Sequence, residues 1–224
     1  AEKNFDHRKF VGEWANEVMK ELSFENEADN MNEISEHMKE AALPVMLPRV
    51  IPGLVSSRIL VMEFIHGEKV SDLATLQRLG VNVERFVQDV CEAVGYSIYL
   101  KGVFNGDPHP GNFMLAQKRS LNLPTPVPGV PDPFADVQDT DWVPVLIDFG
   151  LTLPNLPAFR QPGNRTGTPM YMAPETHRKE PLALQSDLYS LGLVALEFLC
   201  GRKVFRQAGT TEKELLDFKM ELPE

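Results

Sequence analysis

Apolar and polar positions alternate along the chain in patterns that predict three helical regions. Apolar residues at near-helical spacing predict one long helix, or two shorter ones, over residues 8 to about 40. A second helix, with apolar positions at i, i+3, i+4 and i+7, is expected from Val83 to Lys101 and should end at Gly102. A third begins at residue 186 and is capped by Gly201, and the tail after it has helical propensity.

Shorter runs of apolar and β-branched residues predict strands between these helices. They lie at residues 46–51, 58–65, 113–115 and 143–147. The segment 117–144 differs, because it holds six prolines and four aspartates and cannot bury much surface, so we expect an exposed insertion or a mobile loop. Helices and strands in this order predict an α+β fold.

Composition narrows the function classes. The chain has 224 residues, 43% of them hydrophobic, which is enough for one substantial core. Its net charge of −10 argues against nonspecific binding to nucleic acid or to an anionic membrane. No apolar run approaches the roughly 20 residues that span a bilayer, and the first residues carry no targeting pattern; a truncated or excised segment is expected. Cys91 and Cys200 lie in apolar helical patterns, which predicts buried thiols.

Two motifs carry candidate chemistry. Residues 105–112 read Asn-Gly-Asp-Pro-His-Pro-Gly-Asn, and Asp-Phe-Gly follows the strand 143–147 directly. Protein kinases use an Asp, an Asn five residues later and the Asp of Asp-Phe-Gly to hold the metal-nucleotide complex. Asp107 would orient the attacking hydroxyl as a base, while Asn112 and Asp148 would supply the oxygen ligands that Mg²⁺ prefers, with ATP as the nucleotide.

Other chemistries find less support in the sequence. The five histidines show no clustered ligand spacing, which argues against a zinc site. The chain has no Gly-x-Ser-x-Gly elbow for a serine hydrolase. It also has neither a Gly-x-x-x-x-Gly-Lys-Ser/Thr nor a Gly-x-Gly-x-x-Gly phosphate loop.

Residues 10 to about 152 resemble the UbiB family of atypical kinases, also known as aarF-domain kinases. The motif Asp-Pro-His-Pro-Gly-Asn carries most of this resemblance, because ordinary protein kinases have a lysine where His109 stands. The segment 21–30 and the run Leu-Val-Met-Glu-Phe-Ile-His-Gly at 60–67 add to it, although Ser23 departs from the usual Asp. The resemblance implies an ATP-dependent phosphotransferase linked to coenzyme Q or prenyl-lipid metabolism, with mitochondrial or plastid residence.

The resemblance also implies further nucleotide-binding residues. Glu27 or Glu21 would be the acid that pairs with a nucleotide-binding lysine; alone, this acidic stretch is typical of a solvated helix face. The strand at 58–65 runs into His66-Gly67 as a kinase hinge does. There the backbone of Glu63 and Ile65 would face an adenine, with Met62 behind it.

From residue 165 onward, to about 205, the chain resembles an ordinary Ser/Thr protein kinase instead. The carrying stretches are Gly-Thr-Pro-Met-Tyr-Met-Ala-Pro-Glu at 167–175 and Ser-Asp-Leu-Tyr-Ser-Leu-Gly at 186–192. This resemblance implies that Thr168 lines a substrate-positioning loop and that Glu175 and Asp187 have structural roles. A divergent lineage, a fused gene model or a designed chimera would each produce such a hybrid.

Both resemblances imply a protein-kinase-like fold. Residues 1–66 would form part of a small lobe, and residues 67–224 a mostly helical large lobe with the insertion at 117–144. No strand with a Val-Ala-x-Lys lysine and no glycine-rich loop precedes the first helix, so we expect weak or no catalysis from this chain. Three functions stay open: a UbiB-type kinase or ATPase, a Ser/Thr protein kinase, and a non-catalytic pseudokinase scaffold. The expected partners are a nucleotide and a lipid or protein substrate.

Overall fold

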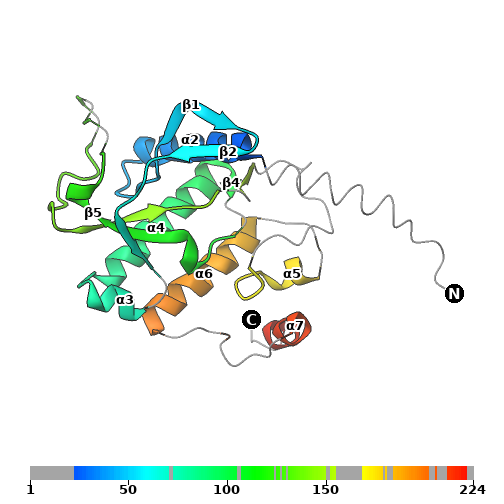
Figure 1. Cartoon of the computed structure of the whole chain (residues 1–224). Coiled ribbons are helices and arrows are strands. Elements are labelled where there is room, and N and C mark those ends of the chain that lie inside the picture. The colour runs from blue at the N-terminus through cyan, green and yellow to red at the C-terminus, as the bar shows by residue number, and fades with distance from the viewer. Residues whose placement is uncertain are drawn as a thin grey trace.

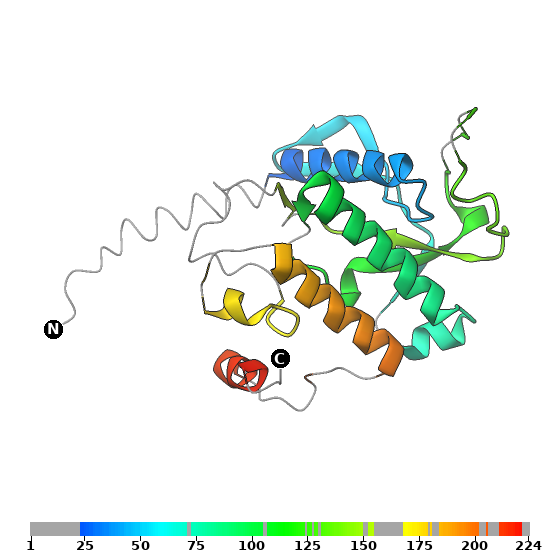
Figure 2. The same ribbon diagram turned by 180° about the vertical axis from the view of Figure 1, so that it is seen from behind.

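The structure is a computed structural model (Figures 1 and 2). It describes residues 23–70, 73–104, 107–123, 125–126, 128–129, 131–149, 152–154, 168–178, 180, 184–201, 205 and 211–220. The predicted mixture of helices and strands is confirmed across these residues. No described helix is long and apolar enough to cross a membrane.

Six α-helices and several shorter helical turns are described. The α-helices are α2 (Phe24–Glu40), α3 (Leu73–Arg78), α4 (Val83–Tyr96), α5 (Pro174–His177), α6 (Leu184–Cys200) and α7 (Glu212–Met220). A π-helical turn, η1 (Ser97–Lys101), extends α4, and two 3₁₀ turns are η2 (Pro110–Asn112) and η3 (Lys118–Ser120). The side chain of Asn82 caps α4 by accepting from the Arg85 N–H at 2.9 Å. The helix ends at Gly102, whose φ of 68° is left-handed.

The strands form three small antiparallel sheets. A hairpin pairs β1 (Val50–Ser56) with β2 (Ile59–Met62), with an irregular register between Val50 and Val55. The central sheet has the order β3 (Gly67–Lys69), β5 (Phe113–Gln117), β6 (Trp142–Leu146). The last pair is β4 (Val103–Phe104) with β7 (Leu153–Pro154). Figure 1 shows α2 lying along the β1–β2 hairpin, and Figure 2 shows α4 and α6 running side by side.

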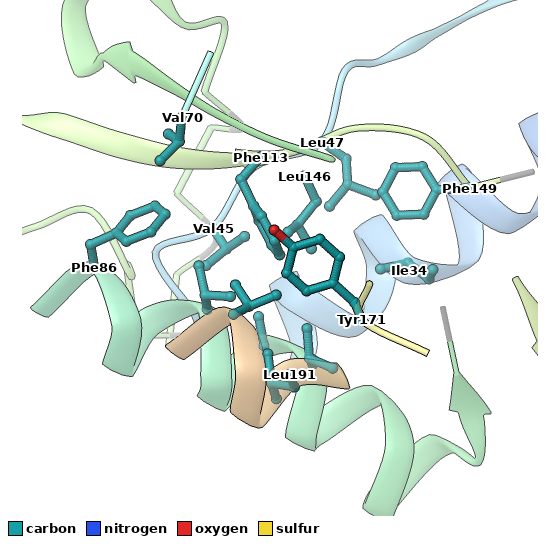
Figure 3. Packing of buried hydrophobic residues seen from close by; sticks show 14 of the residues in the cluster. Ile34, Val45, Leu47, Val70, Phe86, Phe113, Leu146, Phe149, Tyr171 and Leu191 are labelled. Atoms are coloured by element: carbon teal, nitrogen blue, oxygen red, sulfur yellow. The ribbon is translucent and has the colours of Figure 1, made fainter. Parts of the chain in front are cut away.

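One large apolar cluster joins most of these elements. Phe86 of α4 meets Phe113 of β5 and Phe198 of α6 edge to face, at ring-centroid distances of 6.5 and 5.2 Å. Figure 3 shows Phe149 and Tyr171 reaching into the same cluster. The core therefore packs Phe113, next to the 105–112 motif, and Phe149 of the Asp-Phe-Gly motif in one cluster with residues of α4 and α6.

The observed elements refine several predictions. The first predicted helix is confirmed from Phe24 onward, and its earlier part lies outside the described residues. The predicted strand at 46–51 is only partly right, because Met46 makes an isolated bridge to Val145 and β1 begins at Val50. The strand at 58–65 stops at Met62, after which the Glu63 N–H donates to the Arg49 carbonyl, outside the ladder.

Two burial predictions need correction. Cys200 is exposed because it is the last residue of α6, beyond the apolar face, whereas Cys91 is partly buried. The 117–144 segment is mostly exposed as predicted, but Phe134 is 3% exposed and anchors it. Lys118 Nζ fixes the same turn by donating to the carbonyls of Phe134 and Val137 at 2.7 and 2.6 Å.

Candidate functional site

The loop that carries Asp107 is held by short-range contacts around Asn112. The Asn112 side-chain Nδ2 donates to the Asp107 carbonyl at 3.1 Å, and its backbone N–H donates to the His109 carbonyl at 2.9 Å. The Asn112 carbonyl accepts from the Ile147 N–H at 2.9 Å. This last bond connects the loop to the end of β6, directly before Asp148.

Asp148 has an unusual backbone conformation. Its φ is 69°, in the left-handed region that a residue other than glycine seldom adopts. Its side chain is exposed, while the next residue, Phe149, is completely buried in the core. The buried Phe149 thus anchors the exposed Asp148 next to it. Residues in such uncommon backbone conformations cluster at functional sites.

Helix α2 grips this segment from the other side. Asn30 Nδ2 donates to the carbonyls of Phe149 and Thr152 at 3.1 and 3.3 Å. One turn earlier, the Glu27 carboxylate accepts from the Phe149 N–H. Burial raises the pKa of Glu27, the Phe149 hydrogen bond opposes this effect, and the neighbouring negative charge of Asp148 adds to it. The Glu27 and Asp148 carboxylates therefore lie close enough to repel each other.

The segment after residue 168 reaches the same loop through Thr168. Its backbone N–H donates to Asp107 Oδ1 at 2.7 Å, and its hydroxyl donates to Asp107 Oδ2 at 3.0 Å. The two regions with different resemblances thus meet at the candidate base. Hydrogen bonds to an ionised carboxylate are stronger than neutral ones, so this contact fixes the Asp107 side chain.

His109 lies next to the same carboxylate. Its Nδ1 accepts from the Gly111 N–H at 3.0 Å, and its Nε2 lies 3.7 Å from Asp107 Oδ2. Its ring stacks on Tyr171 with centroids 6.1 Å apart. The Tyr171 hydroxyl donates to Glu197 at 2.7 Å, and burial together with this bond raises the pKa of Tyr171.

Glu175 and Asp187, the two residues with predicted structural roles, follow Thr168 in the chain. Glu175 accepts from the Ser186 hydroxyl at 2.8 Å, which joins α5 to the start of α6. Asp187 is 3% exposed. Lys219 of α7 is also buried, and its ammonium donates to the carbonyls of Pro169 and Met172 and lies 3.1 Å from His177 Nε2. These contacts attach α7 to the 168–178 segment.

The remaining residues singled out in the sequence are the candidate adenine contacts, the acid at 21 and the serine at 23. Met62, the last residue of β2, is exposed. The Glu63 carboxylate accepts from the Asn122 side chain, and the Glu63 N–H donates to the Arg49 carbonyl. Ile65 packs in a small second cluster with Ala116 and Val145. Glu21 lies outside the described residues. Ser23 is the N-cap of α2 but makes no side-chain cap bond.

The donor set around Asp148 suits a hard divalent cation. Asn112 Nδ2 donates to the Asp107 carbonyl, so the Asn112 Oδ1 atom points the other way. No described residue donates a hydrogen bond to this oxygen. With Asp148 and Glu27 it supplies the carboxylate and amide oxygens that Mg²⁺ prefers. Within the described ranges, no group of three or more His, Cys, Asp or Glu residues could hold a metal ion.

Comparison with known families identifies the family of the chain. A family model described as "ABC1 atypical kinase-like domain" matches residues 1–162, well over half of the chain. The chain belongs to the ABC1 atypical kinase-like family. The predicted resemblance to aarF-domain kinases is thereby confirmed for the first part of the chain.

Curated relatives of this ABC1 chain are distant and much longer. A Dictyostelium discoideum protein named "Probable serine/threonine-protein kinase abkB" is 31% identical over 115 residues, covering 50% of the chain and 17% of that protein. "ACTIVITY OF BC1 COMPLEX KINASE 1, chloroplastic" from Arabidopsis thaliana is 32% identical over 107 residues, 48% of the chain and 16% of that protein. "AarF domain-containing protein kinase 1" from Gallus gallus is 29% identical, covering 50% of the chain and 21% of that protein. The chain therefore spans about a fifth or less of these relatives.

Three residues that hold the candidate site in place were not predicted from the sequence. Asn30 belongs to a stretch that carried the resemblance, but its targets are backbone carbonyls about 120 residues away. Tyr171 belongs to the 167–175 motif, but the sequence did not predict its stacking on His109. Lys219 belongs to the helical tail, and its bond to the Pro169 carbonyl was not predicted either. A lysine among apolar positions of the tail was the one available signal for the last of these.

Proposed function

We propose that this ABC1 chain is the ATP- and Mg²⁺-binding part of an atypical kinase or ATPase. The observation that supports the proposal is that Asn112 donates to the Asp107 carbonyl and accepts from the Ile147 N–H, directly before Asp148. The family supports a kinase-like activity, and the exposed carboxylate of Asp148 supports a metal-nucleotide ligand.

In this proposal each residue has one role. Asn112 and Asp148 would hold Mg²⁺, which neutralises the phosphate charge when the nucleotide is bound. Glu27, whose carboxylate accepts from the Phe149 N–H, would contribute that carboxylate or pair with a lysine outside the described residues. Asp107 would accept the hydrogen bond of the acceptor hydroxyl and orient it, at a carboxylate that Thr168 already holds in place.

Glu63, Ile65 and Met62 belong to the proposal as adenine contacts. The engaged N–H of Glu63 leaves the backbone of Ile65 as the better candidate for hydrogen bonding to the base. The kinase-like division into two lobes, the link to prenyl-lipid metabolism and residence in an organelle are also proposed here. The relative named as chloroplastic supports the last of these.

The direct test is the free energy of unfolding with Mg-ATP. At about 100 times its dissociation constant, the ligand should add about 2.7 kcal/mol to the wild type. Asp148→Asn should lose this gain, whereas Asp29→Asn, an exposed aspartate of α2, should keep it. Absence of any gain in the wild type, or an equal gain in Asp148→Asn, would overturn the proposal.

The contact between Thr168 and Asp107 favours a second candidate, a Ser/Thr protein kinase. Peptide phosphorylation that depends on Asp107 and Thr168 would support it. ATP hydrolysis stimulated by lipid vesicles, without peptide phosphorylation, would support the UbiB type. If Mg-ATP binds and neither reaction occurs, the scaffold function remains.

A further inference from the structure

A cavity of about 530 Å³ lies between the start of α4 and the 131–141 segment, and none of the candidate site residues lines it. Its volume is that of a small-molecule site. Figure 2 shows the two sides of this region, with α3 and the start of α4 on one side and the chain around β5 and β6 on the other. Its apolar lining includes Leu79, Phe86, Val137 and Trp142.

The walls of this cavity are fixed by specific contacts. The Trp142 indole N–H donates to the Leu79 carbonyl at 3.1 Å, which holds the ring against the turn before α4. The opposite wall is anchored by buried Phe134 and by Lys118, whose ammonium donates to the Val137 carbonyl at 2.6 Å. The cavity is therefore part of the folded structure on both sides.

One charged group lies deep in this cavity. The Asp89 side chain is 8% exposed and lines the cavity from α4. Its Oδ1 lies 2.8 Å from Arg85 Nε, with which it forms an ion pair. Burial raises the pKa of Asp89, and the charge and hydrogen bond of Arg85, whose side chain is 60% exposed, oppose this effect only in part, so the buried carboxylate is incompletely compensated.

The lining as a whole is negative. Asp136 and Asp141 join Asp89 against the single base Arg85, so an anionic ligand would meet net repulsion. Asp141 also accepts from the Gln138 N–H at 2.8 Å, which fixes one of these charges at the cavity. A cation with an apolar body would match both the charge and the aromatic lining.

We propose that this cavity binds a small organic cation, an amine whose ammonium group donates to Asp89 and whose apolar body packs against Phe86, Val137 and Trp142. The ammonium adds a second charged donor to the buried Asp89 carboxylate, beside the exposed Arg85. A neutral alcohol of the same shape gains the apolar contact and a hydrogen bond to Asp89, but not the attraction between opposite charges. The site does not depend on the proposed nucleotide function, since it shares no residue with it.

Three matched probes test the proposal on the full 224-residue chain. They are 3-phenylpropylamine, 3-phenylpropan-1-ol and 3-phenylpropanoate, titrated at pH 7 while the indole N–H signals are followed by NMR. The chain has two tryptophans, so the Trp142 signal can be assigned by substitution. The amine should shift the Trp142 signal and bind at least tenfold more tightly than the alcohol, and the acid should bind most weakly.

Substitutions separate the charge from the cavity. Asp89→Asn should lower amine affinity to that of the alcohol, whereas Glu92→Gln, an exposed acid of the same helix, should not change it. Val137→Trp, on the largely exposed segment, should fill the cavity and abolish binding of all three probes. Asp148→Asn should leave amine binding unchanged.

Four outcomes would overturn the proposal. They are equal affinity for amine and alcohol, no binding of any probe, an unchanged Trp142 signal, and amine binding that survives Asp89→Asn. Should Asp89→Asn fail to fold, as judged by circular dichroism, the comparison of the three probes on the wild type decides the question, with Val137→Trp as the control that loses all binding.

Discussion

The regions before residue 154 and after residue 168 satisfy their polar side chains in different ways. In the first region, Asn30 and Glu27 bind the backbone of the Asp-Phe-Gly segment, and Asp148 stays exposed. In the second, buried side chains bind one another and nearby carbonyls, as in the bonds from Tyr171 to Glu197 and from Ser190 to the Tyr171 carbonyl.

This difference separates two tasks. The first region uses its side chains to position a strained backbone and leaves carboxylate oxygens at the surface, where a ligand can reach them. The second binds several of its buried polar side chains to one another and to nearby carbonyls, although the buried Tyr189 hydroxyl has no hydrogen-bond partner among the described residues, so this region serves as a support. The two meet where Thr168 binds both oxygens of Asp107, so the support positions the candidate base.

The largest effect should come from Phe149→Ala. Removing a completely buried aromatic side chain leaves a cavity, and we expect a loss of about 3–5 kcal/mol in the free energy of unfolding, measured with urea. Phe64→Ala is the control, because Phe64 is 77% exposed and should change stability by less than about 0.5 kcal/mol. Equal losses in both would show that Phe149 does not anchor the first region.

Thr168→Val tests the contact between the two regions. It removes the hydroxyl donor to Asp107 and should cost about 1.5–3 kcal/mol, as a hydrogen bond to a charged group does. Thr168→Ser keeps the donor and should recover most of this loss in the same urea titration. A serine variant as unstable as the valine variant would contradict the role of the hydroxyl.

Asn30→Ala tests the grip of α2 within the first region. Two hydrogen bonds to backbone carbonyls are lost, and we expect about 1–2 kcal/mol of destabilisation. The exposed Asn26 lies one turn earlier on the same helix, and Asn26→Ala should have little effect. The increase in unfolding free energy on adding Mg-ATP should be measured in both variants as well. This increase should be smaller in Asn30→Ala and unchanged in Asn26→Ala.

The smallest effect concerns the pH dependence of the second region. Burial lowers the pKa of Lys219 from 10.5 to about 8. Between these values the unfolded chain holds the proton and the folded chain does not, so stability rises with pH. The difference in unfolding free energy between wild type and Lys219→Met should grow by about 1 kcal/mol from pH 8 to pH 9. A flat difference over this range would show that Lys219 keeps its proton when buried.

Local patterns were enough to predict most of the helices and strands. The spacing of apolar residues from Val83 to Lys101 gave one continuous helix, and the structure has it with a π-helical last turn. The ends were less certain, since β1 begins four residues after Met46. Strand ends depend on pairing with a distant neighbour, which periodicity within one segment does not contain.

For the candidate site, the motifs indicated which residues carry chemistry but not what holds them. The link between Asn112 and Asp107 joins residues five apart and follows from the loop itself. Thr168 meets Asp107 across 61 residues, and Lys219 reaches Met172 across 47. Such contacts depend on how the helices pack, so sequence spacing alone could not give them.

The left-handed backbone at Asp148 also has a consequence for protein engineering. Glycine adopts that conformation without the cost of about 1–2 kcal/mol that a side chain brings. Asp148→Gly would therefore relieve backbone strain at the position where the proposed metal ligand is lost. Selection of variants for thermal stability alone would be drawn toward such changes, so it should be paired with a screen for nucleotide binding.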